Sequence, residues 1–158
     1  MRYLARIVAV LLAFVLPLAV AADPPAVIGS WTLDLAKSKY QPASSAPKSE
    51  TLSYEMVGDS TKLTARIETA GGQVVEGGGT YKADGKSYPL SGNPDFDALS
   101  VRRLNRLEAR GTLMQAGKVV GHVSTVTSRD GKTYTMTTTL TTASGQKTRS
   151  VAVFDRQQ

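Results

Sequence analysis

Residues 119–155 have the sequence VVGHVSTVTSRDGKTYTMTTTLTTASGQKTRSVAVFD, in which segments rich in Val and Thr alternate apolar with polar side chains. Two turn signals, Asp130-Gly131 and Ser144-Gly145, separate these segments, and glycine supplies the positive φ that a tight hairpin turn needs. Val and Thr favour the pleated surface of a sheet over a helix. The stretch therefore predicts three long antiparallel strands, over residues 119–128, 133–142 and 148–155.

Similar turn signals recur at nearly regular intervals before this stretch. They are Gly58-Asp59, Gly71-Gly72, Asp84-Gly85 and Ala116-Gly117. Each predicts a tight reversal between neighbouring antiparallel strands. A meander this long tends to close, because closure removes the exposed edges of the sheet. We therefore predict an all-β fold, a single antiparallel up-and-down β-barrel of about 8–10 strands.

The first half of the chain supplies further segments in which apolar residues occupy every second position. They cover residues 29–33, 50–56, 62–69 and 73–81. This alternation predicts half-buried strands with one face towards the core. Trp31, Leu52, Tyr54, Leu63 and Ile67 are the expected inward residues.

Two segments of the chain allow more than one interpretation. Gly77–Gly79, inside the strand 73–81, mark a bulge, a sharp bend or a close approach of backbone or ligand. In a small barrel we predict a bend where the sheet coils. Residues 97–111 fit either a helix capped at Asp97 or two short strands joined at Asn105-Arg106. The regular turns on both sides favour the two strands.

Residues 1–22 are predicted to be a signal peptide. Arg2 lies in a positively charged start, and the apolar run that follows is too short for a comfortable membrane span. Small residues then provide a cleavage pattern, and we expect the cut near Ala21 or Ala22. Residues 23–158 would form a periplasmic or secreted barrel domain, with no membrane span in the mature protein.

The composition limits the chemistry that the chain can perform. The absence of cysteine excludes disulfides, thiol catalysis and thiolate metal sites. His122 is the only histidine, so a catalytic triad or a histidine-based metal site lacks partners. The net charge of +6, to which the signal peptide contributes, is modest and does not favour nucleic acid. We predict no enzyme activity, no cofactor, no metal and no nucleic-acid partner.

Two features between the regular turns carry clustered charge. The loop Asn93–Asp97 gathers oxygens of the kind that Ca²⁺ prefers, but it lacks the EF-hand glycine and terminal glutamate, and its residues are ordinary turn formers. A basic cluster follows in the sequence, made of Arg102, Arg103, Arg106 and Arg110. If this cluster forms strands, Arg102 and Arg103 point to opposite faces, so Arg103 can enter the barrel and meet an anionic head group.

Short motifs resemble those of lipocalins and their relatives. Gly29-Ser30-Trp31 resembles the Gly-x-Trp signature, in which the Trp plugs the closed end of the barrel. The ending Val151–Asp155 is similar to that of the fatty-acid-binding branch. Residues 35–40 and 91–97 resemble stretches of small secreted bacterial lipocalin-like proteins of unassigned function. The resemblance implies a lipocalin-like barrel of the calycin superfamily.

The sequence departs from the fatty-acid-binding branch at the position of its ligand clamp. That branch holds the ligand carboxylate with an Arg-x-Tyr pair on the last strand, and the corresponding residues here are Ala152 and Phe154. The loop Gln41–Pro47 also leaves no room for the long helical lid of that branch. The resemblance therefore implies the barrel without the carboxylate clamp.

These observations favour an exported, monomeric, non-catalytic binding protein that holds a small, largely apolar ligand inside a β-barrel. The predicted ligand-binding residues are Trp31, Tyr54, Ile67, Tyr81, Arg103, Tyr134, Met136 and Phe154. The alternative is a secreted protein-binding scaffold or inhibitor that acts through its loops. In that case the barrel interior would be filled by side chains.

Overall fold

A computed structural model describes residues 23–158, and the predicted signal peptide and its cleavage point lie outside this range. The described residues form eleven strands and one short 3₁₀ turn, η1 (Ala43–Ser45). The strands are β1 (Gly29–Leu33), β2 (Lys39–Gln41), β3 (Ser49–Val57), β4 (Ser60–Glu68), β5 (Val74–Tyr81), β6 (Asp84–Pro89), β7 (Ala98–Arg103), β8 (Glu108–Gln115), β9 (Lys118–Thr127), β10 (Thr133–Thr141) and β11 (Lys147–Arg156). None of the helical structure in this range is long and apolar enough to cross a membrane.

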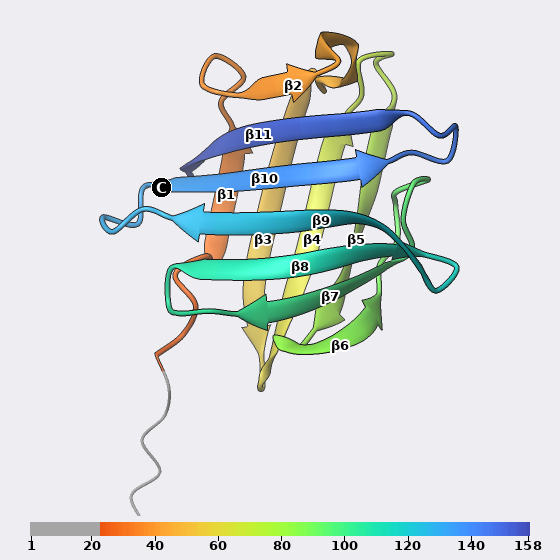
Figure 1. The fold of residues 1–158 in the computed structure, drawn as a ribbon. Coiled ribbons are helices and arrows are strands. Elements are labelled where there is room, and N and C mark those ends of the chain that lie inside the picture. The colour runs from red at the N-terminus through yellow and green to blue at the C-terminus, as the bar shows by residue number, and fades with distance from the viewer. Residues whose placement is uncertain (1–22) are drawn as a thin grey trace, which may run out of the picture.

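The strands form one antiparallel barrel in the order β5-β4-β3-β1-β11-β10-β9-β8-β7-β6. In Figure 1, β1, β3, β4 and β5 form one wall, and β7 to β11 run across it as the other wall. The short strand β2 pairs with β11 beside this path and lies at the top of the view. The predicted all-β, up-and-down barrel is confirmed.

Every predicted turn but one joins two paired strands. The prediction for Asp84-Gly85 is wrong, because β5 and β6 stand at the two ends of the strand order instead of forming a hairpin. Gly85 has a φ of 82° and lies where the pairing of β6 with β7 shifts register, between Asp84 and Ser87. A glycine with positive φ suits a bulge as well as a turn, so the dipeptide alone does not separate the two.

The ambiguous residues 97–111 form two strands, as predicted. β7 and β8 pair from Ala98 opposite Met114 to Arg103 opposite Ala109. In the turn between them, the side-chain oxygen of Asn105 accepts hydrogen bonds from the backbone of Leu107 and Glu108, at 2.8 and 3.0 Å.

The glycine run in β5 forms the seam of the barrel. Gly78 exchanges two backbone hydrogen bonds with Ser91, of 3.1 and 2.9 Å, and so joins β5 to the segment after β6. A Cβ on Gly77 would collide with the carbonyl oxygen of Ser91. The pairing of β4 with β5 passes through the glycines without a register shift. The run therefore serves a close approach of two backbones, in place of the bend that the sequence favoured.

The loop Asn93–Asp97 fastens two hairpins at one edge of the barrel. A carboxylate oxygen of Asp95 accepts a hydrogen bond from the backbone N–H of Ala143, at 2.9 Å, in the turn between β10 and β11. Asp97 does the same for Ala116, at 3.0 Å, in the turn between β8 and β9. The two carboxylates therefore act as turn caps.

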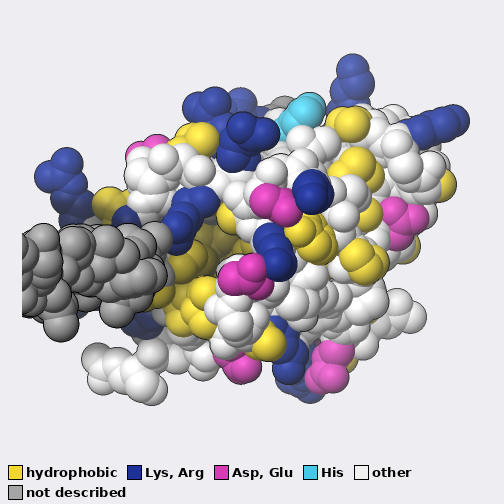
Figure 2. Space-filling model, turned by 90° about the horizontal axis from the view of Figure 1, so that it is seen from below, with side chains coloured by type: hydrophobic (Ala, Val, Ile, Leu, Met, Phe, Trp, Pro, Cys, Tyr) yellow, Lys and Arg dark blue, Asp and Glu magenta, His cyan; other side chains and the backbone are white. Residues whose placement is uncertain are grey.

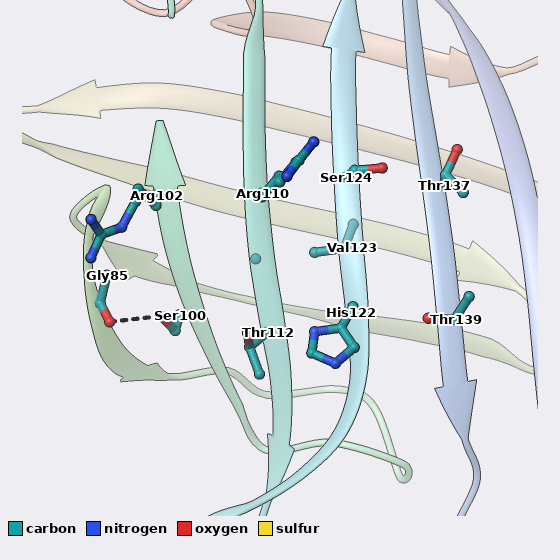
Figure 3. Close-up of a pocket in the computed structure, with 11 residues that line it drawn as sticks. Gly85, Ser100, Arg102, Arg110, Thr112, His122, Val123, Ser124, Thr137 and Thr139 are labelled. Atoms are coloured by element: carbon teal, nitrogen blue, oxygen red, sulfur yellow. Dashed lines mark hydrogen bonds between the residues drawn. The ribbon is translucent and has the colours of Figure 1, made fainter. Parts of the chain in front are cut away.

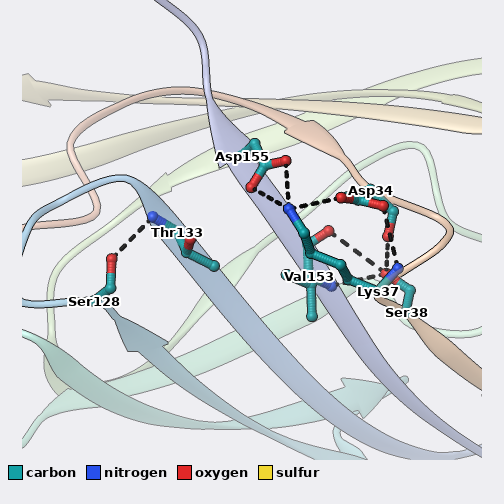
Figure 4. Close-up of polar contacts among 7 residues, drawn as sticks. All are labelled: Asp34, Lys37, Ser38, Ser128, Thr133, Val153 and Asp155. Carbon is teal, nitrogen blue, oxygen red and sulfur yellow. Dashed lines mark hydrogen bonds and ion pairs between the residues drawn. The ribbon is translucent and has the colours of Figure 1, made fainter.

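The connection from β1 to β2 is held against β11 by polar contacts (Figure 4). Lys37 forms ion pairs with Asp34 and Asp155, at 2.8 and 3.0 Å. The hydroxyl of Ser38 donates to the carbonyl of Asp34 and accepts from the backbone N–H of Val153, at 2.6 and 2.9 Å. The ion pairs are exposed and contribute little individually. Together these contacts place β2 over one end of the barrel.

The close approach at the seam predicts that alanine destabilises the protein at Gly77 and not at Gly71. Neither glycine has a positive φ, so the comparison isolates the steric effect. Gly77→Ala should lower the free energy of unfolding by about 1–3 kcal/mol, because its Cβ meets the Ser91 backbone. Gly71→Ala is the matched control, since its Cβ would meet only Thr69 at 3.8 Å. Urea denaturation of both variants checks this. Equal midpoints would show that the seam is not tightly packed.

Candidate functional site

An aromatic layer fills one part of the barrel interior. Tyr134 lies at its centre, with ring centroids 5.3 Å from Trp31, 5.7 Å from Tyr54 and 5.8 Å from Phe154. Trp31 and Phe154 are fully buried. Four of the predicted ligand-binding residues therefore lie together, and in this structure they pack mainly against one another.

Arg156 closes the barrel on the outer side of this layer. Its guanidinium lies 4.1 Å from the centre of the Trp31 ring, within the range of a cation–π interaction. The same group donates hydrogen bonds of 2.8 Å to the carbonyls of Ile28 and Ala26. The indole N–H of Trp31 donates to the carbonyl of Val27 at 2.7 Å. The segment before β1 is thereby bound across this end of the barrel, where the Gly-x-Trp resemblance places the plug.

A small cavity of about 40 Å³ lies at the same end, between the leader segment (residues 23–28, before β1) and strands β4, β5 and β7 to β9. Figure 2, the view from below, shows a hollow there with hydrophobic side chains on its floor and basic side chains at its border. Tyr81, Val101 and Arg103 are among its lining residues. The volume suits one or two water molecules, so a larger guest must displace side chains.

The remaining predicted residues are spread around the interior. Tyr81 belongs to a second core cluster with Leu99, Val101 and Leu113. Arg103 points to the inward face, but its guanidinium donates to the carbonyl of Asp23 at 3.2 Å. It therefore holds the leader segment, and the structure does not place it with Tyr54 or Tyr134.

Ile67 and Met136 line a part of the interior nearer to β2, here called the looser end because its apolar side chains are only half-buried. Ile67 lies opposite Val75 on the inward face, and Met136 lies opposite Ala152. Ile67, Val75, Met136 and Leu140 all remain half-buried, unlike the aromatic layer. This end of the barrel therefore keeps apolar surface that neighbouring side chains do not cover.

Two polar side chains that the sequence reasoning missed share this looser end. Glu50 has the same strand parity as Leu52 and Tyr54, so it faces inward on β3. Tyr40 of β2 lies opposite Ser150 on the inward face of β11. The hydroxyl of Tyr40 is buried and has no hydrogen-bond partner among the described residues. The alternation of residues 50–56 was the signal that could have revealed Glu50.

Burial changes the protonation of these groups. Desolvation raises the pKa of the Glu50 carboxyl from 4.5 to about 7. It also raises the pKa of the Tyr40 hydroxyl, and the nearby Glu50 charge adds to that effect. Tyr54 and Tyr134 share a hydrogen bond of 3.1 Å between their hydroxyls. The interior thus combines an apolar lining with one poorly solvated carboxyl group.

A larger hollow of about 560 Å³ lies on the outer face of β6 to β10. Figure 3 shows Arg102, Arg110 and His122 along its floor, among serine and threonine side chains. Cross-strand pairing explains the cluster, because Arg102 lies opposite Arg110 and Thr112 lies opposite His122. The predicted divergence of Arg102 and Arg103 to opposite faces is therefore correct.

No family model and no curated protein matches this sequence. Among solved structures, the chain is similar to zebrafish ileal bile acid-binding protein complexed with cholic acid. The TM-score is 0.52, and the match covers 84% of this chain and 99% of that chain. The sequence identity is 16%, so the likeness concerns the fold. Together with the strand order, it shows that this chain shares the antiparallel β-barrel fold of that protein.

The closed end predicts a specific role for the guanidinium of Arg156. Arg156→Lys should lower the free energy of unfolding by about 2–4 kcal/mol, because lysine cannot keep the forked hydrogen bonds and the ring contact together. Trp31 is the only tryptophan, so a red shift of its fluorescence should report exposure of this layer. Arg149→Lys, an exposed position on the same strand, is the control. If both substitutions lower the free energy of unfolding equally, Arg156 has no specific role in closing this end of the barrel.

The buried carboxyl of Glu50 predicts a pH-dependent stability. The folded protein keeps the Glu50 proton up to about pH 7, whereas the unfolded chain releases it near the ordinary pKa of 4.5. The folded state binds more protons in this window, so the free energy of unfolding falls as pH rises through it. Relative to Glu50→Gln, the parent should lose about 1–3 kcal/mol between about pH 5 and about pH 8. Parallel pH profiles in urea denaturation would contradict this, and Glu55→Gln is the exposed control.

Proposed function

We propose that this chain is an exported, monomeric, non-catalytic binding protein that holds a small, largely apolar molecule inside its barrel. The observation that carries the proposal is the set of inward but half-buried apolar residues near β2, namely Ile67, Val75, Met136 and Leu140. Apolar surface left uncovered inside a barrel favours an apolar guest. Because Met136 is flexible, it can shift to accommodate one.

The structural neighbour supports the same class of function. Its printed description is a bile acid-binding protein complexed with cholic acid, a small molecule held by a protein with this fold. The sequence adds that His122 has no histidine or cysteine partner for nucleophilic or metal chemistry. Both points favour binding over catalysis.

The alternative, a protein-binding scaffold with a filled interior, draws support from the aromatic layer and the small cavity beside it. The loop Asn93–Asp97 is less favourable to this alternative, since Asp95 and Asp97 already cap neighbouring turns. Mass spectrometry of solvent extracts from the purified protein separates the two. A reproducible small apolar molecule supports the carrier, and its absence together with failure to bind a neutral dye supports the scaffold.

Neighbouring residues on β10 provide a direct test of where the guest binds. Met136 faces the interior, whereas Thr137 lines the outer hollow. Met136→Trp should fill the looser end and weaken binding of the neutral dye Nile red about tenfold or more. Thr137→Trp should leave binding unchanged. Fluorescence titration measures both, and circular dichroism checks the fold. The reverse order of effects would place the dye on the outer face and overturn interior binding.

A further inference from the structure

We infer that the ligand carries a hydrogen-bond-donating head group, an alcohol or an amine, which lies against the Glu50 carboxyl and the Tyr40 hydroxyl. This inference rests on the proposed interior binding. It specifies which polar group the apolar guest presents and at which end of the barrel. Three observations about the described residues lead to it.

The first observation is that these two polar groups have no partner in the chain. Tyr40 keeps a buried hydroxyl without a hydrogen bond. Glu50 takes part in none of the side-chain hydrogen bonds or ion pairs found between residues 23 and 158. The nearby charges Lys48 and Glu68 lie 3.8 Å apart, pair with each other and are exposed. The Tyr40 hydroxyl is buried, and Glu50 is half-buried. An unpaired polar group that is shielded from water is costly, so a guest that pairs with these two groups gains affinity.

The second observation is that both groups face the same space. The inward side of β3 carries Glu50, and the inward side of β11 carries Ser150 with Tyr40 opposite it. The Glu50 charge acts on the Tyr40 hydroxyl across this space and raises its pKa. Half-buried apolar residues lie beside them, among them Ile67 and Met136. A guest with one polar end and an apolar body matches this arrangement.

The third observation concerns the sign of the charge. Within residues 23–158, the arginines that face inward are Arg103 and Arg156, both at the opposite end of the barrel. Each already donates to backbone carbonyls, those of Asp23 for Arg103 and those of Ala26 and Ile28 for Arg156. Once Glu50 is ionised, above about pH 7, a ligand carboxylate near it would meet a like charge, and no inward arginine at this end balances that charge. The interior therefore disfavours a fatty acid and favours a donor.

The test compares three ligands with the same alkyl chain: dodecanol, dodecylamine and dodecanoate. Displacement of Nile red from the full-length mature protein at about pH 8, where Glu50 is ionised, measures each affinity. The parent should bind the alcohol or the amine about tenfold or more tightly than the carboxylate. Equal affinities, or a preference for dodecanoate, would overturn the inference and leave interior binding intact. If neither Nile red nor any of these ligands binds, the proposed function fails and the inference fails with it.

Substitutions identify the residues responsible and separate the two head groups. Glu50→Gln should weaken dodecylamine about tenfold and dodecanol only slightly, because the amide keeps an acceptor but loses the charge. Tyr40→Phe should weaken the preferred donor ligand severalfold, and Glu55→Gln, which lies on the exposed face of β3, should change nothing. An amine ligand should also bind more tightly as pH rises from about 6 to about 8. A donor preference that survives both Glu50→Gln and Tyr40→Phe would overturn the assignment.

Discussion

The guanidinium of Arg156 connects the last strand of the domain to its N-terminal segment. It lies over the Trp31 ring and donates to carbonyls of the segment before β1. In the strand order, β1 stands between β3 and β11, so this contact lies where the last strand meets the first. The cation is satisfied by backbone acceptors and by an aromatic face, which makes its partial burial tolerable. The orientation of Trp31, and hence the packing of Tyr134 and Phe154 beneath it, depends on this arrangement.

The barrel closes differently on its other side. There the contact is mainly between backbones, because Gly77 and Gly78 allow β5 to approach Ser91 closely. The Ser91 hydroxyl adds a hydrogen bond of 3.2 Å to the carbonyl of Gly78. The pairing is short, so β5 and β6 retain edges along most of their length. Side-chain packing therefore stabilises the end held by Arg156, whereas the small size of the β5 glycines permits the seam.

The interior is divided into a tightly packed end and a looser end. Trp31, Tyr134 and Phe154 fill the first, and the second holds half-buried apolar residues with Glu50 and Tyr40 among them. A carboxyl group with a raised pKa is a cost to the folded state when it is charged. Retaining such a group in a barrel whose walls are otherwise apolar is consistent with a role in binding. We therefore assign the tightly packed end to fold stability and the looser end to the proposed binding of a guest.

The sequence by itself determined the strands, most turns and the inward faces, because these follow from local alternation and from glycine conformations. It also placed Trp31 and the strand pair within residues 97–111 correctly. It could not separate a bulge from a hairpin at Asp84-Gly85, since both use a glycine of positive φ.

Only the tertiary structure decided which residues meet across the barrel, because such contacts depend on strand order and register. It brought Arg156 to Trp31 and Gly78 to Ser91 from distant parts of the chain. It also set Glu50 near Tyr40, since β2 pairs with the last strand and not with its neighbours in sequence. The local sequence pattern determines which face of a strand a side chain occupies. The strand order and register of the folded chain determine which residues it contacts.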